Sequence, residues 1–144
     1  MSVPIVAKRS TECRAFRISR NDTNYFALLF DPEGEQVDLT CVIEIFNQGG
    51  KTPPNVHHRA HEMFYVLHGE GIARCGDIAQ PIRRGDALLI RPGGVHVVEN
   101  TGPGKLYTLT VMVPNEEFAQ LIRNGQPVTL DADDLAVING VGAG

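Results

Sequence analysis

Short β-rich runs separated by glycine and proline constrain the fold of this chain more than any other feature. The clearest run extends from Val37 to Ile45, where apolar and mostly polar residues alternate with a period of two. Such a period is typical of a strand with one buried face. Shorter runs of the same kind lie at 24–30, 63–67, 71–75, 87–91, 95–99 and 105–113. Because no helix signal lies between them, they predict an all-β fold, an antiparallel sandwich or barrel.

Helix signals are confined to the C-terminal part of the chain. Asn115 can cap the segment EEFAQLIRN, which has two glutamates at its start and Arg123 in its last turn. A weaker second helix is predicted to start near Asp131–Asp134. We therefore expect a helical segment over about 115–137, packed on the outside of the sheet.

Length, charge and cysteine content narrow the class of protein. A chain of 144 residues fits one domain, so we expect a single domain over 1–144 with its barrel at about 13–113. The formal net charge of -4 provides no positive field for phosphate backbones, which argues against a nucleic-acid partner.

No apolar window approaches the ~18 residues that a membrane span requires, and no secretory signal is evident at the start. Cys13, Cys41 and Cys75 form no CxxC pair, which favours reduced thiols. The expected protein is cytoplasmic and has no membrane partner.

Four of the five histidines lie between Asn55 and Gly71, in the stretch NVHHRAHEMFYVLHGEG. His57 and His58 precede Glu62 across a predicted turn, which can bring an imidazole and the carboxylate together. A further donor has to come from elsewhere, and His96 in RPGGVHVVEN is the only distant histidine. Histidine and carboxylate with an incomplete shell are a ligand set for iron, manganese, nickel, copper or zinc.

Several of these residues also have a purely structural explanation. His61 and His68, taken alone, are typical of surface or hydrogen-bonded histidines on a strand. The Glu62 carboxylate can equally form a salt bridge with Arg59 or Arg91. The metal hypothesis therefore depends on the combined set rather than on any single residue.

Taken together, these residues resemble the two motifs of the cupin superfamily. The first motif, G(X)5HXH(X)3-4E(X)6G, corresponds to Gly50, His57 or His58, Glu62 and Gly69. The second, G(X)5PXG(X)2H(X)3N, corresponds to Gly85, Arg91 in place of proline, Gly93, His96 and Asn100. The resemblance implies a single-domain jelly-roll barrel (double-stranded β-helix) with a short C-terminal helix. It also implies a divalent transition metal ion (Fe, Mn, Ni, Zn or Cu).

The first motif is incomplete in this chain. A four-residue gap before Glu62 places His57 at the second histidine position and Asn55 at the first. A three-residue gap places His58 at the second position and Val56 at the first. The resemblance implies that the metal ligands come from His57, His58, Glu62 and His96, with Asn55, the neighbouring histidine or water completing the shell. We favour His57, because the polar Asn55 then faces the site.

The resemblance implies oxygenase-, isomerase- or decarboxylase-type chemistry on a small organic molecule inside the barrel. The alternatives are a non-catalytic module that binds a small metabolite or sugar beside a degenerate metal site, and a purely structural barrel. By alternation, Phe64, Val66 and Val98 share their faces with the candidate ligands, which predicts apolar surroundings for the site. We also expect a homodimer, because the β-rich segment from Cys13 to Phe30 can pair with the sheet of a second copy.

Overall fold

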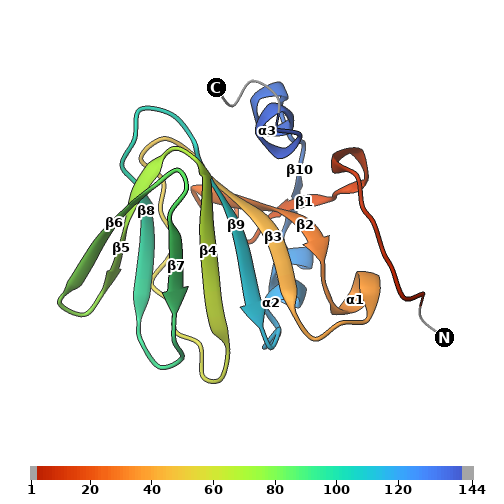
Figure 1. Ribbon diagram of the computed structural model, residues 1–144, viewed down its shortest axis with the longest axis horizontal. Coiled ribbons are helices and arrows are strands. Elements are labelled where there is room, and N and C mark those ends of the chain that lie inside the picture. The colour runs from red at the N-terminus through yellow and green to blue at the C-terminus, as the bar shows by residue number, and fades with distance from the viewer. Residues whose placement is uncertain (1–2, 141–144) are drawn as a thin grey trace.

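The computed structural model describes residues 3–140, which form two antiparallel sheets (Figure 1). The larger sheet has the order β10-β1-β2-β3-β9-β4-β7 and the smaller one the order β6-β5-β8. The strands of the larger sheet are β1 (Ala15–Arg17), β2 (Asn24–Phe30), β3 (Thr40–Phe46), β4 (His61–His68), β7 (Ala87–Ile90), β9 (Leu106–Val113) and β10 (Gln126–Val128). Those of the smaller sheet are β5 (Glu70–Cys75), β6 (Ile78–Arg83) and β8 (His96–Asn100). The all-β jelly-roll prediction is confirmed.

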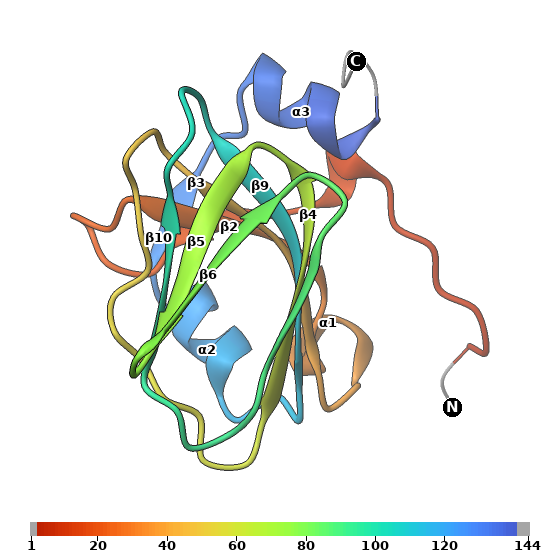
Figure 2. The same cartoon turned by 60° about the vertical axis from the view of Figure 1, so that its left-hand side comes forward.

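Four short helical elements lie in the connections and after the last long strand. They are η1 (Ser10–Glu12), α1 (Pro32–Glu35), α2 (Phe118–Arg123) and α3 (Ala132–Ile138). Figure 2 shows α2 at the same end of the barrel as the loops that lead into β4 and β8. None of the helices in residues 3–140 is long and apolar enough to cross a membrane.

The barrel interior is filled by apolar side chains from both sheets. On β4, buried and exposed residues alternate, and the buried Phe64 and Val66 pack with Phe46 of β3. Val98 of β8 joins the same cluster from the smaller sheet. Each such side chain contributes roughly 1.5–3 kcal/mol when fully buried, so this cluster holds the two sheets together. Of the apolar neighbours predicted for the site, Phe64 lines the cavity of the candidate ligands, whereas Val66 and Val98 belong to the core cluster and do not line it.

The strand predicted over Val37–Ile45 differs from the expectation in two ways. It begins at Thr40, and both of its faces are buried rather than one. Its odd-numbered residues, including Ile43, pack in a second apolar cluster on the outer side of the sheet. The face expected to be solvated turns inward, so that Glu44 lies inside the barrel at 2% exposure. The alternation was correct, but it did not reveal that other elements cover the outer face.

Helix α3 covers part of that outer face. Its buried Asp134 accepts hydrogen bonds from the hydroxyls of Tyr25 and Tyr107, at 2.8 and 2.7 Å, and from the ammonium of Lys105 at 3.0 Å. Asp131 caps the helix and forms a capping box with Asp134. A charged group at this depth is held by three donors, which fixes the C-terminal segment to β2 and β9.

The C-terminal segment is not continuously helical, although the short C-terminal helix is confirmed. The sequence analysis did not predict β10, which separates α2 from α3 and pairs with β1. Consequently β1 lies between β2 and β10. The segment Cys13–Phe30 was expected to pair with the sheet of a second copy, but its strands already have partners on both sides within the chain. The ends of the larger sheet are β10 and β7.

Candidate metal centre

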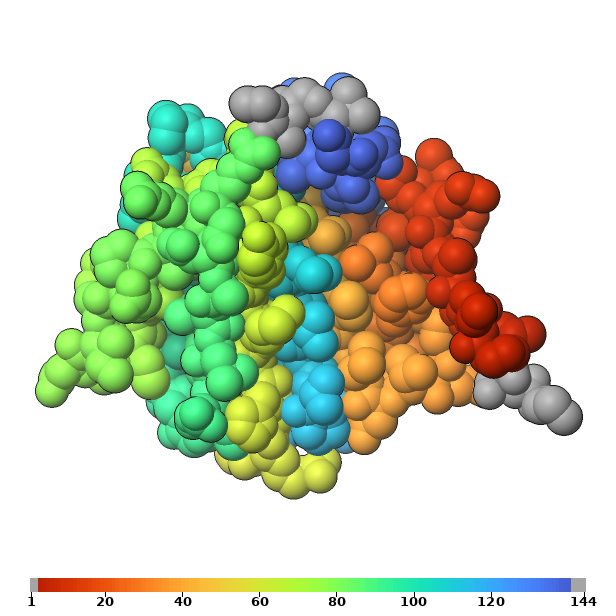
Figure 3. Space-filling view, viewed as in Figure 1, coloured from red at the N-terminus to blue at the C-terminus, as the bar shows by residue number. Residues whose placement is uncertain are grey.

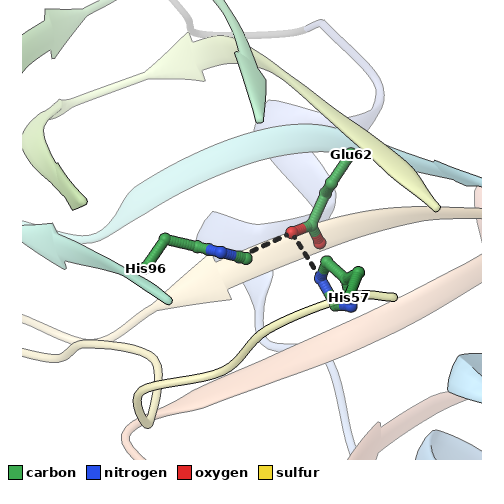
Figure 4. A group of neighbouring side chains, drawn as sticks. All are labelled: His57, Glu62 and His96. Carbon is green, nitrogen blue, oxygen red and sulfur yellow. Dashed lines mark hydrogen bonds and ion pairs between the residues drawn. The ribbon is translucent and has the colours of Figure 1, made fainter. Parts of the chain in front are cut away.

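His57, Glu62 and His96 converge inside the barrel (Figure 4). The Nε2 atoms of His57 and His96 both lie 3.1 Å from the same carboxylate oxygen, Oε1 of Glu62. The three donor atoms lie within 4.8 Å of one another. Glu62 and His96 are buried, and the side chain of His57 is 12% exposed. Two of the three residues come from strands and one from a loop.

Backbone pairing brings the two distant segments together. Asn55 and His96 exchange two backbone hydrogen bonds, at 3.1 and 2.9 Å. The amide of Gly93 donates to the carbonyl of His57 at 2.8 Å. Glu62 is the second residue of β4 and is paired with neighbours in both β7 and β9, so its backbone is held by a strand on either side. Backbone hydrogen bonds between the loop before β4 and the segment around His96 therefore bring the residues of the two motifs together.

Hydrogen bonding determines the orientation and the charge of the buried groups. Nδ1 of His96 lies 2.9 Å from the carbonyl of Gly94, which accepts its proton and leaves Nε2 facing Glu62. Burial by itself would raise the pKa of the Glu62 carboxyl, but hydrogen bonds from His57 and His96 outweigh it and hold that pKa below its ordinary value. Burial lowers the pKa of His96, but its hydrogen bond to Glu62 outweighs burial and raises it. Each of these two groups therefore favours the charged form of the other.

The spacing of the donors suits a transition metal ion. Two ligands bound at about 2.1 Å and separated by 90–110° lie roughly 3.0–3.4 Å apart. Each imidazole Nε2 lies 3.1 Å from the Glu62 oxygen, whereas the two Nε2 atoms are bounded only by the 4.8 Å that encloses the whole set. Two imidazoles and one carboxylate are the donor types that iron, manganese, copper, nickel and zinc accept. Three protein donors leave further coordination positions for an exogenous ligand. The residues present therefore fit a metal.

The three residues line a cavity of about 670 Å³, a size suited to a small organic molecule. Its walls are mainly apolar, with Phe26, Phe64, Met112 and Phe118 among the lining residues. Phe118 belongs to α2, so that helix closes one side of the cavity. Polar side chains line it as well: besides the candidate metal centre, Asn24 and Glu44, they include Asp22, Thr52, Arg59 and Glu116.

The structure separates the candidate ligands that the sequence left open. His58, the alternative to His57, is exposed and does not belong to the cluster. Asn55 lines the cavity, but its Nδ2 donates to the carbonyl of Pro53 at 3.0 Å. Arg91 is exposed; the ion-pair partners of Glu62 within residues 3–140 are the two histidines. The salt bridges considered for Glu62, with Arg59 or Arg91, are absent from the described part of the chain.

The other two histidines of the stretch lie apart from the centre. His61 is exposed on the opposite face of β4 from Glu62. His68 packs against the ring of Tyr107, with ring centroids 6.0 Å apart. Asn100, the last residue of the second motif, is structural: its Nδ2 donates to the carbonyls of Asn47 and Gly104 at 2.9 and 2.7 Å.

Glu116 is a site residue that sequence reasoning missed. Its carboxylate accepts three backbone hydrogen bonds from the loop that carries His57: from His58 at 3.0 Å, Arg59 at 2.6 Å and Ala60 at 3.2 Å. Its backbone has φ of 51°, a left-handed conformation that non-glycine residues rarely adopt. The sequence suggested only a favourable charge at a helix start, because nothing local indicates that this carboxylate reaches a loop 56–58 positions away.

Glu44 and Asn24 were also missed as cavity residues. Nδ2 of Asn24 donates to Oε2 of Glu44 at 2.9 Å, and the hydroxyl of Thr110 donates to Oε1 at 3.2 Å. Burial, followed by the nearby charge of Glu62, raises the pKa of Glu44 to about 8. A glutamate inside an otherwise apolar strand was the available signal, but alternation assigned it to the solvated face.

Comparison with known proteins agrees with this architecture. The family described as "Cupin domain" matches residues 42–112. An uncharacterized protein of Methanocaldococcus jannaschii is 30% identical over a segment that covers 46% of this chain and 53% of its own length. An oxalate-binding protein of Thermotoga maritima is 35% identical over a segment that covers 40% of this chain and 47% of its own length. The matched segments span about half the length of these relatives. A crystal structure from T. maritima, described as a predicted oxalate decarboxylase, is 27% identical and superposes with a TM-score of 0.67 over 76% of this chain and 99% of that one.

Proposed function

Because the chain belongs to the cupin superfamily, we propose that it binds a divalent transition metal ion through His57, Glu62 and His96 and acts on a small organic molecule in the adjoining cavity. The observation that carries this proposal is the convergence of both imidazole Nε2 atoms on one buried carboxylate oxygen at 3.1 Å. A buried cluster of imidazoles and a carboxylate beside a cavity contributes little to stability alone, but it is a suitable ligand set for a cation.

Each residue has a distinct part in this function. The bound metal supplies a Lewis acid for oxygen atoms of the substrate. Glu62 contributes the negative charge, and the Gly94 carbonyl keeps the ring of His96 turned toward the centre. His57 completes the ligand set from a loop and is the most exposed of the three side chains. The apolar walls exclude water from that ligand.

The descriptions of two similar proteins mention oxalate, which supports a ligand of this chain that carries a carboxylate or other oxygen atoms. One of them is an oxalate-binding protein and another a predicted oxalate decarboxylase. Fold does not select the reaction, and the similarity covers only part of the curated relative. We therefore assign the class of chemistry, metal-assisted binding and activation of an oxygen ligand, and not a particular reaction.

A non-catalytic binding module is the second candidate. It is favoured by the incomplete histidine pair of the first motif, since the Asn55 amide bonds to Pro53. In this case the cavity would hold its ligand without stoichiometric metal.

Elemental analysis of protein purified without a histidine tag separates the two candidates. We expect about one transition metal ion per chain, lost in His57→Ala, Glu62→Ala and His96→Ala and retained in the control variant His61→Ala, which changes an exposed histidine next to Glu62. His58→Ala tests the alternative ligand and is expected to retain metal. Protein that carries no metal but still binds oxalate by calorimetry supports the non-catalytic module instead.

We also propose a homodimer, now through a different surface from the one first expected. On the outer face of β4, β7 and β9, large apolar side chains are exposed in residues 3–140: Met63, Tyr65, Leu89 and Val113. In the space-filling view these strands lie side by side in the middle of the face, beside the regions that α3 and the N-terminal segment occupy (Figure 3). A contiguous apolar surface of this kind favours association with a second copy.

A further inference from the structure

The cavity has a second polar centre besides the candidate metal ligands. Asn24 of β2 and Glu44 of β3 line the same cavity as His57, Glu62 and His96. Both are buried, at 2% exposure, and they are joined by a hydrogen bond of 2.9 Å. The remaining oxygen of Glu44 accepts from the Thr110 hydroxyl. This pair is therefore a fixed polar element of the cavity wall, which also includes the apolar Phe26 and Phe64.

One atom of this pair has no partner. Oδ1 of Asn24 is buried and forms no hydrogen bond within residues 3–140. Leaving a buried polar atom unpaired costs the desolvation free energy of that atom, and such atoms are uncommon in folded proteins. Turning the amide over would merely leave Nδ2 unpaired in its place. Because Asn24 lines the cavity, a polar group of a ligand that reaches its amide would supply the missing partner.

We propose that Asn24 and Glu44 recognise a hydroxyl group of the substrate, so that the substrate class is a small hydroxylated acid rather than a simple dicarboxylate. This inference rests on the proposed function, because the metal centre would hold the acid end of the same molecule. A hydroxyl can donate to Oδ1 or accept from Nδ2, and so it satisfies the Asn24 amide in either orientation. A methyl group can do neither.

The same wall disfavours a second carboxylate. Oxalate has only hydrogen-bond acceptors once it is ionised, so it cannot donate to Asn24 Oδ1. Its far carboxylate could bind here only by accepting a hydrogen bond from the protonated Glu44 carboxyl, and that contact leaves Oδ1 of Asn24 without a donor. The chain thus shares a metal-type centre with its oxalate-related neighbours, whereas this part of its cavity suits a different ligand.

Calorimetric titration of the metal-loaded protein with a matched ligand series tests this inference. Lactate, glycerate and erythronate share the same hydroxycarboxylate end, and the latter two add further hydroxyl groups. We expect glycerate or erythronate to bind at least about tenfold more tightly than lactate, a difference of about 1.4 kcal/mol. Asn24→Leu and Glu44→Gln should bring the ratio close to one while they leave the metal content unchanged.

Thr108→Val is the matched control. Thr108 is buried and bonds only to Thr110 among the described residues, without lining the cavity, so it should keep the preference of the wild type. Thermal unfolding of each variant verifies that it is folded. Equal affinities for the three ligands, no binding of either polyhydroxylated acid, or a preference that persists in Asn24→Leu would overturn the inference. Loss of the metal from the wild type contradicts the proposed function instead, and the two failures are thus distinguishable.

Discussion

Two buried glutamates in one cavity show how partners, rather than burial, decide the charge of a side chain. Both are almost inaccessible to solvent. Glu62 receives hydrogen bonds from two imidazoles that can carry positive charge, and its pKa is lowered despite burial. Glu44 receives hydrogen bonds only from the neutral Asn24 and Thr110, so burial dominates and raises its pKa to about 8. Near neutral pH, Glu62 is therefore ionised and Glu44 is largely protonated.

The raised pKa of Glu44 predicts a pH dependence of stability. A carboxyl whose pKa rises from 4.5 to about 8 on folding stabilises the protein fully below pH 4.5 and loses that contribution as the pH rises through 8. We expect the free energy of unfolding of metal-free protein to fall by up to a few kcal/mol between pH 5 and 9, since one pKa unit corresponds to about 1.4 kcal/mol. Glu44→Gln should remove most of this slope.

Denaturant titrations at several pH values, with chelator present, measure the slope. Some slope should persist in Glu44→Gln, because the raised pKa of His96 also makes its contribution disappear at higher pH. The exposed Glu70→Gln is the control and should behave as the wild type. An identical slope in Glu44→Gln would mean that Glu44 is ionised throughout this range.

At the scale of elements, the centre combines rigid strands with one clamped loop. Glu62 and His96 are on β4 and β8, whereas His57 is on the loop between β3 and β4. The loop pairs with β8 through Thr52 and Asn55, and beyond His57 the carboxylate of Glu116 binds three of its backbone amides. The left-handed backbone at Glu116 and Glu117, with φ of 51° and 66°, is a local cost that these hydrogen bonds offset. Residues before α2 therefore position a metal ligand that they do not contact.

This clamp predicts an effect of Glu116 on metal affinity. Glu116→Ala should weaken metal binding, because the loop carrying His57 loses three hydrogen bonds. We expect a loss of about tenfold, the lower end of the effects seen for residues that orient metal ligands. Glu117→Ala is the matched control: it changes an adjacent glutamate that also has positive φ but no side-chain hydrogen bond to the loop. Competition with a chromophoric chelator measures both affinities. Equal affinities for the two variants would remove Glu116 from the positioning of His57.

Strands with a strong hydrophobic pattern could be predicted from the sequence. Strands that are short or mostly exposed, and that are recognised only by their backbone pairing, could not. The long interior strands, such as β2 and β9, were found because their residues are apolar. β6 was missed because only Ile82 of its residues is buried, and β1 and β10 have three residues each. Of the three clustered residues, Glu62 and His96 followed from motif spacing, whereas the choice between His57 and His58 needed the loop conformation.

At the scale of the whole molecule, the outer face of the larger sheet is covered unevenly. Over β2 and β3 it is buried beneath α3 and its neighbours. Over β4 and β7 it remains open, with Tyr65 and Leu89 exposed by 42% and 53%. Helix α3 is held by Asp134 and cannot extend over this region without breaking its hydrogen bonds. We therefore propose that a second chain covers the exposed apolar side chains of β4 and β7.

Light scattering coupled to size-exclusion chromatography tests the homodimer. The expected mass at tens of micromolar protein is twice the 15.7 kDa of the chain. Leu89→Lys should shift the population toward monomer, because it places a charge in the apolar patch. Ile78→Lys, which changes an even more exposed apolar residue on β6 of the smaller sheet, should not. A monomeric mass for the wild type contradicts the proposal.

The most direct test of the central claim is anomalous diffraction from crystals of the tag-free protein grown with a divalent transition metal such as Mn²⁺ or Zn²⁺. We predict one strong anomalous peak inside the barrel, about 2.0–2.2 Å from Nε2 of His57, Nε2 of His96 and a carboxylate oxygen of Glu62. A peak bound instead by His58, His61 or His68, or no peak in the barrel at saturating metal, would contradict it.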